Sequence, residues 1–260
     1  MQEGTEELGI LEKLTNEKLR NLSSDVLGFY QDKVQVSSLD EAVAIGVNTI
    51  SQCGDKWHNA RNVRVTGSVA YQIYTYSSNK KPDWSRKYEG IYKSKFTGNA
   101  KTRRGVRGEV LARARYSEET KEKVIQCGLV VKTEVPWLGY SPDGIMNENG
   151  TIAKLLEFKS PDAGEKLPAK EMLATQAISS LDDDDKLKKR HPHYGQIHLG
   201  LMLLGAHECE YVNYSFVDNN LARITVEYDK AFALKMAKTL CDTYFQELLP
   251  RMAAESMDVD

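Results

Sequence analysis

The sequence has little of what membrane and secreted proteins require. No run approaches the roughly 20 consecutive apolar residues that span a bilayer, so we expect no membrane association. The N-terminus carries Glu3, Glu6 and Glu7 where a secretion signal would have a basic and then an apolar segment. We therefore expect an intracellular protein, with nucleus and cytoplasm not distinguished.

Closely spaced cysteines are also lacking. Cys53, Cys127, Cys209 and Cys241 lie far apart, without the short spacing of zinc sites. We expect reduced cysteines with structural roles. His191 and His193 flank Pro192 and could form a metal pair, but a loop at the start of a helix is the interpretation we favour.

Net charge is almost absent as well, at −2, yet the charges are unevenly distributed. The segment from Lys56 to Arg107 contains 13 lysines and arginines against only Asp83 and Glu89. Such segregation gives one face of a protein the positive potential that attracts phosphates, while the remainder stays acidic. The charge pattern thus permits a nucleic-acid partner that the net charge alone would not suggest.

Two short apolar segments carry charged residues that can act together. Asp143 stands in Ser141-Pro142-Asp143-Gly144, and Glu157 and Lys159 stand in Leu156-Glu157-Phe158-Lys159. Asn149-Gly150 between them is a strong hairpin signal, which predicts adjacent strands. Residues i and i+2 of a strand share a face, so Glu157 and Lys159 form a polar reaction surface while Leu156 and Phe158 enter the core.

The chemistry of this group favours metal-dependent hydrolysis. Carboxylates are hard ligands suited to magnesium or manganese. A bound metal polarises a phosphodiester and lowers the pKa of a bound water, and Lys159 would counter negative charge in the transition state. The alternatives are an ordinary Asp-Gly turn and a solvated strand edge. Glu109, on a helix predicted for residues 106–116, could complete the metal shell through water.

The order of the motifs resembles the PD-(D/E)xK nucleases and, among them, the lambda-exonuclease-like branch, also called YqaJ-type viral recombinases. The resemblance covers the chain from Trp57 to the final helix. Its motifs, in order, are Trp57-His58-x-x-Arg61 with Val65-Thr66-Gly67-Ser68, Gly105-x-x-x-Glu109, Ser141-Pro142-Asp143-Gly144, Leu156-Glu157-Phe158-Lys159 and Gln196 on an apolar helix.

The resemblance implies roles for individual residues. Asp143 and Glu157 would bind Mg²⁺, for which Mn²⁺ may substitute, with Glu109 assisting and Lys159 as the catalytic lysine. The positions that hold the 5′-phosphate of the degraded strand match Arg61, Ser68, Ser141 and Gln196. A guanidinium and small hydroxyls form charge-assisted bonds to phosphate oxygens. Outside the family context, Arg61 would be an ordinary surface arginine.

The expected fold is α/β (α+β), a restriction-endonuclease-like core in which helices flank a central mixed sheet. Periodicity predicts strands at 129–135, 143–146 and 152–159, a helix at 193–204, two further alternating strands and a closing helix capped by Asp229. We expect an N-terminal helical extension over 1–55, an exonuclease domain over 56–250 and a disordered tail over 251–260.

The function expected from the resemblance is a magnesium-dependent 5′-to-3′ exonuclease acting on ends of linear double-stranded DNA. It would leave 3′ single strands for recombination or end processing. The alternatives are an endonuclease of the same fold and a DNA-end-binding protein without turnover. The family also implies a single-strand-annealing recombinase as partner and a homotrimer, with a monomer as the alternative assembly.

Overall fold

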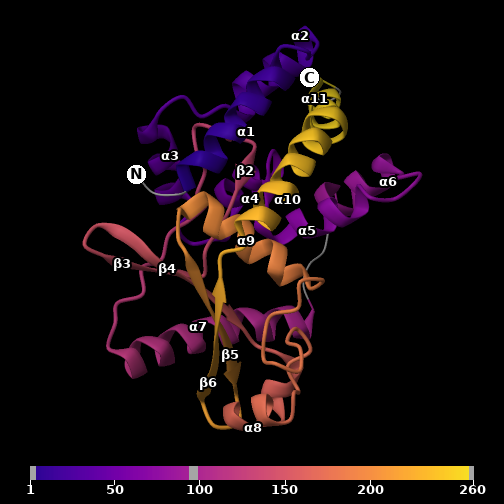
Figure 1. The fold of residues 1–260 in the computed structure, drawn as a ribbon. Helices are drawn as coiled ribbons and strands as arrows, with labels where there is room; N and C mark the ends of the chain where they lie inside the picture. Colours follow the sequence, from indigo (N-terminus) through magenta and orange to yellow (C-terminus); the bar gives the residue numbers. More distant parts are fainter. Residues whose placement is uncertain (1–3, 94–98, 258–260) are drawn as a thin grey trace.

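A four-stranded mixed sheet lies at the centre of the computed structural model, which describes residues 4–93 and 99–257. Its strands are β3 (Gly144–Glu148), β4 (Thr151–Lys159), β5 (Glu208–Ser215) and β6 (Asn220–Glu227), in that order. Strands β4 and β5 run parallel, whereas β3–β4 and β5–β6 are antiparallel. The expected mixed sheet flanked by helices is confirmed (Figure 1).

The turn between β3 and β4 is the predicted hairpin turn. Asn149 and Gly150 have φ angles of 53° and 84°, which place both in the left-handed region that a type I′ turn requires. The Asn147 side chain accepts a hydrogen bond from the Gly150 N–H at 3.0 Å. This turn fixes the register of β3 and β4, and thereby the position of Asp143, one residue before β3, relative to Glu157 on β4.

Helix α7 (Ala100–Thr120) covers one face of the sheet. The buried cluster between them comprises Ala112, Tyr116, Met146, Leu156, Phe158, Val212 and Tyr214. A Cβ atom added to Gly108 would lie 1.7 Å from the Ser160 Oγ, so only glycine permits this close approach of helix and strand end. The motif from Gly105 to Glu109 contains two glycines, and Gly108 is the one that the packing requires.

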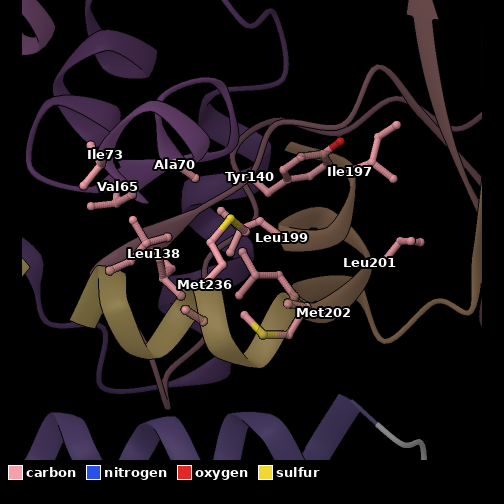
Figure 2. Close-up of a cluster of buried hydrophobic side chains, with 14 of the residues drawn as sticks. Val65, Ala70, Ile73, Leu138, Tyr140, Ile197, Leu199, Leu201, Met202 and Met236 are labelled. Carbon is pink, nitrogen blue, oxygen red and sulfur yellow. The ribbon is translucent and has the colours of Figure 1, made fainter. Parts of the chain in front are cut away.

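Helix α9 (Pro192–Leu204) crosses the other side of the sheet and packs on α5 (Gly67–Tyr76), α10 (Lys230–Thr243) and α1 (Gly4–Leu19). It ends at Gly205, whose φ of 67° is typical of a helix C-cap. Figure 2 shows the apolar side chains of α9, α5 and α10 meeting around Leu138 and Tyr140. Asp229 caps α10 as predicted, accepting from the Phe232 N–H at 3.0 Å.

The remaining helices are short and lie mainly in the N-terminal part. They are α2 (Ser24–Phe29), α3 (Leu39–Asn48), α4 (Asp55–Asn62), α6 (Trp84–Tyr88), α8 (Ala169–Ala174) and α11 (Leu249–Met257). Helices α1, α2 and α3 account for most of residues 4–55. Arg64 ties this segment to the core, because its buried guanidinium donates to the carbonyls of Val34 at 2.9 Å and Pro136 at 2.8 Å.

Two sequence predictions are wrong. Residues 129–135 form no strand, because only Val130 pairs, in a single bridge with Tyr140. The alternating apolar residues there are buried as an irregular segment. Residues 251–257 are not a disordered tail but part of α11, whose Met252 and Ala253 are buried against the core.

Within the described residues, no helix combines the length and the apolar character needed to cross a membrane.

Candidate functional site

Asp143, Glu157 and Lys159 meet where β3 begins and β4 ends. Gly144 pairs with Leu156, so Asp143, one residue earlier, faces the end of β4. The Asp143 Oδ2 accepts from the Phe158 N–H at 2.9 Å and lies 3.5 Å from the Lys159 Nζ, which also forms an ion pair with the Glu157 Oε1. The predicted convergence of two carboxylates and a lysine on one face is present in the structure.

Glu157 is fully buried instead of lying on an open polar surface. The Tyr140 hydroxyl donates to its Oε2 at 2.7 Å, and the Gln196 Nε2 donates to its Oε1 at 2.5 Å. Tyr140 reaches this position because α9 has a glycine there: a Cβ on Gly200 would lie 2.5 Å from the tyrosine ring. Packing thereby fixes the orientation of the Glu157 carboxylate.

The electrostatics of the group favour an additional cation. Burial raises the pKa of Glu157 to about 7, and repulsion from Asp143 adds to this shift. Burial likewise raises the pKa of Glu109 to about 7. Burial alone would lower the pKa of Lys159, but the three surrounding carboxylates outweigh it and raise that pKa well above its ordinary value. One ammonium group thus compensates several clustered carboxylates.

Glu109 projects from α7 toward the same place. Together with Lys159 it lines a cavity of about 480 Å³, and one turn further along α7 the Arg113 Nε donates to the Asp143 carbonyl at 3.0 Å. The helix is therefore anchored directly to the residue that begins β3. This anchoring brings the predicted assisting carboxylate to the two predicted metal ligands.

The donor set fits a hard divalent cation, although the side chains are not arranged as a closed metal cage. Over residues 4–93 and 99–257, no three His, Cys, Asp or Glu side chains are grouped closely enough to hold a metal. The Lys159 ammonium stands between the carboxylates. Asp143, Glu157 and Glu109 offer only oxygen ligands, the type that Mg²⁺ and Mn²⁺ prefer.

The two histidines near Pro192 have structural contacts. The His191 ring accepts from the His193 N–H at 3.2 Å and caps α9, with Pro192 as the first helical residue. The His193 Nδ1 lies 2.7 Å from the Tyr211 hydroxyl, and burial lowers the pKa of His193 to about 3. This geometry agrees with the helix-start loop favoured from the sequence.

Three of the four predicted phosphate-binding residues form one connected group. Strand β1 (Val65–Thr66) pairs in parallel with β2 (Leu138–Gly139), which brings Ser68 and Ser141 to the same end of the pair. The Arg61 Nη2 donates to the Ser68 Oγ at 2.8 Å. Ser68 lies in the first turn of α5, where backbone N–H groups favour anions. Burial lowers the pKa of Arg61 to about 10, which leaves it cationic at neutral pH.

Trp57 connects this group and was not predicted as a site residue. The Arg61 guanidinium lies 4.1 Å from the centroid of the Trp57 ring, and the Trp57 Nε1 donates to the Ser141 Oγ at 3.1 Å. The four-residue spacing of Trp57 and Arg61 on α4 was a signal for the stacking contact. The bond to Ser141 joins residues 84 positions apart, so no local pattern indicates it.

The fourth predicted residue, Gln196, lies between the two groups. It donates to Glu157, and its Cγ lies 3.4 Å from where a Cβ of Gly67 would be. Gln196 therefore contacts a predicted metal ligand directly. Gln196 is also next to Gly67, which precedes Ser68.

Comparisons with known proteins identify a family model and several similar solved structures. The model of the YqaJ-like viral recombinase domain matches residues 56–189. The solved alkaline exonuclease LHK-Exo from Laribacter hongkongensis is 21% identical, with a TM-score of 0.57 over 80% of this chain and 100% of that chain. The KSHV SOX RNA complex is 13% identical, with a TM-score of 0.52 over 90% of this chain and 83% of that chain. No curated protein sequence matches the chain.

Proposed function

The chain belongs to the YqaJ-like viral recombinase domain family, and from this premise we propose that it is a metal-dependent 5′-to-3′ exonuclease acting on linear double-stranded DNA. One observation carries the proposal. The buried carboxylate and lysine group lies beside the connected group of Arg61, Ser68 and Ser141, with Gln196 between them. A site for hydrolysis thus adjoins a site for a phosphate.

In this proposal Asp143 and Glu157 hold the cation directly, and Glu109 assists. The cation, Mg²⁺ with Mn²⁺ as a substitute, would polarise the phosphodiester and lower the pKa of a water. Lys159 supplies a fixed positive charge beside the scissile phosphate, where it stabilises the transition state. Tyr140 and Gln196 hold the Glu157 carboxylate in one orientation through their hydrogen bonds.

Arg61, Ser68 and Ser141 hold the terminal 5′-phosphate. Ser141 is two residues from Asp143. Binding the terminal phosphate therefore sets how far the strand extends past the metal ligands and brings the next phosphodiester into register. Degradation of one strand in this register leaves a 3′ single strand. The basic segment from Lys56 to Arg107 would contact the phosphates of the duplex.

We further propose that residues 56–250 form the catalytic unit and that the helices of residues 1–55 extend it. Helix α1 contacts α9 and α10, and α2 contacts α11, which supports an extension that packs on the helices of the core. A single-strand-annealing recombinase would accept the 3′ strand that the enzyme produces. The homotrimer implied by the family is a further proposal, which sedimentation of the purified protein would test.

The test compares linear and covalently closed circular duplex DNA in the presence of Mg²⁺. The proposal predicts degradation of the linear form to nucleotides while the circle stays intact. Opening of the circle would indicate an endonuclease, and binding of ends without degradation would indicate an end-binding protein. Because the SOX relative was solved with RNA, a single-stranded RNA of matched sequence is the necessary third substrate.

A further inference from the structure

The cavity beside Lys159 has a wall to which no function has yet been given. Its volume is about 480 Å³, within the usual range of small-molecule sites. Lys159 and Glu109 stand on one side. Lys101 and Asp162 also line the cavity and form an ion pair with each other at 3.0 Å. The remaining polar residues form an uncharged wall, namely Ser160, Ser179, Ser180, His191, His193, Tyr211 and Asn213.

Asn213 is the most informative residue of this wall. It pairs with Lys159 across the parallel strands β4 and β5, and its side chain is 0% exposed. Among the described residues, neither its Nδ2 nor its Oδ1 has a hydrogen-bond partner, and the buried Ser160 Oγ has none either. Buried polar groups are nearly always paired, because leaving them unpaired costs free energy. Unpaired groups that line a cavity therefore indicate a ligand.

The chemistry of the wall indicates a neutral ligand. The Tyr211 hydroxyl lies 2.7 Å from the His193 Nδ1 and 3.1 Å from the Ser180 Oγ, so these three groups are already oriented by one another. Burial keeps the His193 ring uncharged at neutral pH by lowering its pKa. Pro161, Ala163 and Ala177 add apolar surface. A planar molecule with polar edges and apolar faces, such as a nucleobase, matches this lining.

The position of the cavity indicates which nucleotide of the degraded strand would contribute this base. Tyr140 and Gln196 approach Glu157, and Gln196 borders Gly67, which precedes Ser68 of the phosphate group. Asn213 and Ser160 lie farther along the strands, beside and beyond Lys159. A strand whose 5′-phosphate is held at Arg61 would pass the scissile phosphate near Lys159. It would then reach the cavity with its second nucleoside.

On the basis of the proposed function, we propose that this cavity binds the second nucleoside of the degraded strand, on the far side of the scissile phosphate from the 5′ end. The Asn213 amide both donates and accepts, so it can hydrogen-bond the edge of any of the four bases. Ser160 adds a second contact. Binding here draws the strand out of the duplex and holds the first phosphodiester at the carboxylates.

The test uses a 5′-phosphorylated linear duplex in which the second nucleotide of the degraded strand is either intact or an abasic tetrahydrofuran. For the wild type, the abasic residue should slow the first cleavage about tenfold, which is the effect of losing one or two hydrogen bonds to neutral groups. Asn213→Leu should slow cleavage of the intact substrate by a similar factor. On the abasic substrate, Asn213→Leu should cleave as fast as the wild type does, because the substitution and the abasic residue remove the same interaction.

Three controls separate this role from a structural one. Tyr214→Phe changes the neighbouring residue on the opposite face of β5 and should leave the abasic effect at its wild-type size. Ser160→Ala should reduce the abasic effect in part, and it serves if Asn213→Leu does not fold. An abasic residue at the first position should have a much smaller influence on the wild type.

Equal slowing of intact and abasic substrates by Asn213→Leu, with an unchanged ratio between them, would overturn the inference. So would wild-type cleavage that is indifferent to the abasic residue. If the wild type does not degrade the intact linear duplex at all, it is the proposed exonuclease function that fails. The two failures are therefore distinguishable in the same experiment.

Discussion

The indole N–H of Trp57 donates to the Ser141 hydroxyl at 3.1 Å, and the Trp57 ring lies under the Arg61 guanidinium. One side chain thus positions two residues that come from α4 and from the segment after β2. Since neither contact uses a phosphate, the proposed phosphate pocket would be preorganised before DNA binds, which would reduce the free-energy cost of fixing the strand end.

Trp57→Phe retains an aromatic ring beneath Arg61 but removes the donor to Ser141. We expect the preference for a 5′-phosphate over a 5′-hydroxyl end to fall by roughly 2- to 12-fold, the effect of one neutral hydrogen bond. Initial rates on the two ends measure it. Asn59→Ala, an exposed change on the same helix, should leave the preference unaltered. A full preference in Trp57→Phe would exclude the positioning role.

Removal of the carboxylates should separate catalysis from binding. Asp143→Ala with Glu157→Ala should abolish cleavage and retain much of the DNA affinity, because phosphate contacts to basic residues supply most of the binding free energy. Lys159→Ala should lower kcat more than it changes KM, since the proposed role of the lysine is to stabilise the transition state. Glu148→Ala, exposed at the far end of β3, is the matched control. Metal-dependent cleavage by the double variant at the wild-type rate would exclude the assigned site.

The oxygen-only donor set predicts which metals support turnover. Protein stripped with EDTA should regain activity with Mg²⁺ or Mn²⁺. Ca²⁺ should permit DNA binding without cleavage, because its looser coordination positions a water poorly. Nuclease rates and gel-shift affinities, measured for each metal, test this. Recovery with Zn²⁺ alone would contradict the ligand assignment.

His198 should make the fold sensitive to acid. It is fully buried between Tyr194 and Phe232, its Nδ1 accepts from the Asp229 N–H at 3.2 Å, and burial lowers its pKa to about 4. In the unfolded chain the His198 ring takes up a proton near pH 6.5, whereas in the folded protein the ring stays neutral until the pH falls to about 4. Stability contributed by the neutral ring is therefore complete above pH 6.5 and declines as the pH falls toward 4.

Between pH 7.5 and 5, this histidine should reduce the free energy of unfolding by about 2 kcal/mol. His198→Asn keeps an acceptor near the position of Nδ1 but does not titrate. Urea unfolding at the two pH values should show a pH-dependent loss of stability that is smaller by that amount in the variant. Identical losses in both proteins would show that His198 does not contribute.

The sequence predicted those features that depend on residues close together along the chain, namely strand alternation, the hairpin turn and a helix cap. Alternation located Leu156 and Phe158 in the core and Glu157 and Lys159 on the other face, Asn149-Gly150 set the hairpin, and Asp229 capped its helix. Alternation over 129–135 misled because burial in an irregular segment produces the same pattern as a strand.

The contacts that shape the site depend on tertiary packing. Tyr140 reaches Glu157 only because Gly67 and Gly200, from two different helices, leave room for its ring. Asn213 stands beside Lys159 through the parallel pairing of β4 with β5, strands separated by almost fifty residues. Such arrangements join distant positions, and no spacing along the chain specifies them.

The most direct test of the account is the effect of the terminal phosphate, measured as initial rates on linear duplexes that carry a 5′-phosphate or a 5′-hydroxyl. The account predicts faster degradation of the phosphorylated end. Arg61→Ala should remove most of that difference, because a lost charged hydrogen bond costs roughly 1.5–3 kcal/mol, or about 10- to 150-fold, while the hydroxyl-ended duplex slows far less. Equal wild-type rates on the two ends would contradict the phosphate pocket and the 5′-to-3′ direction.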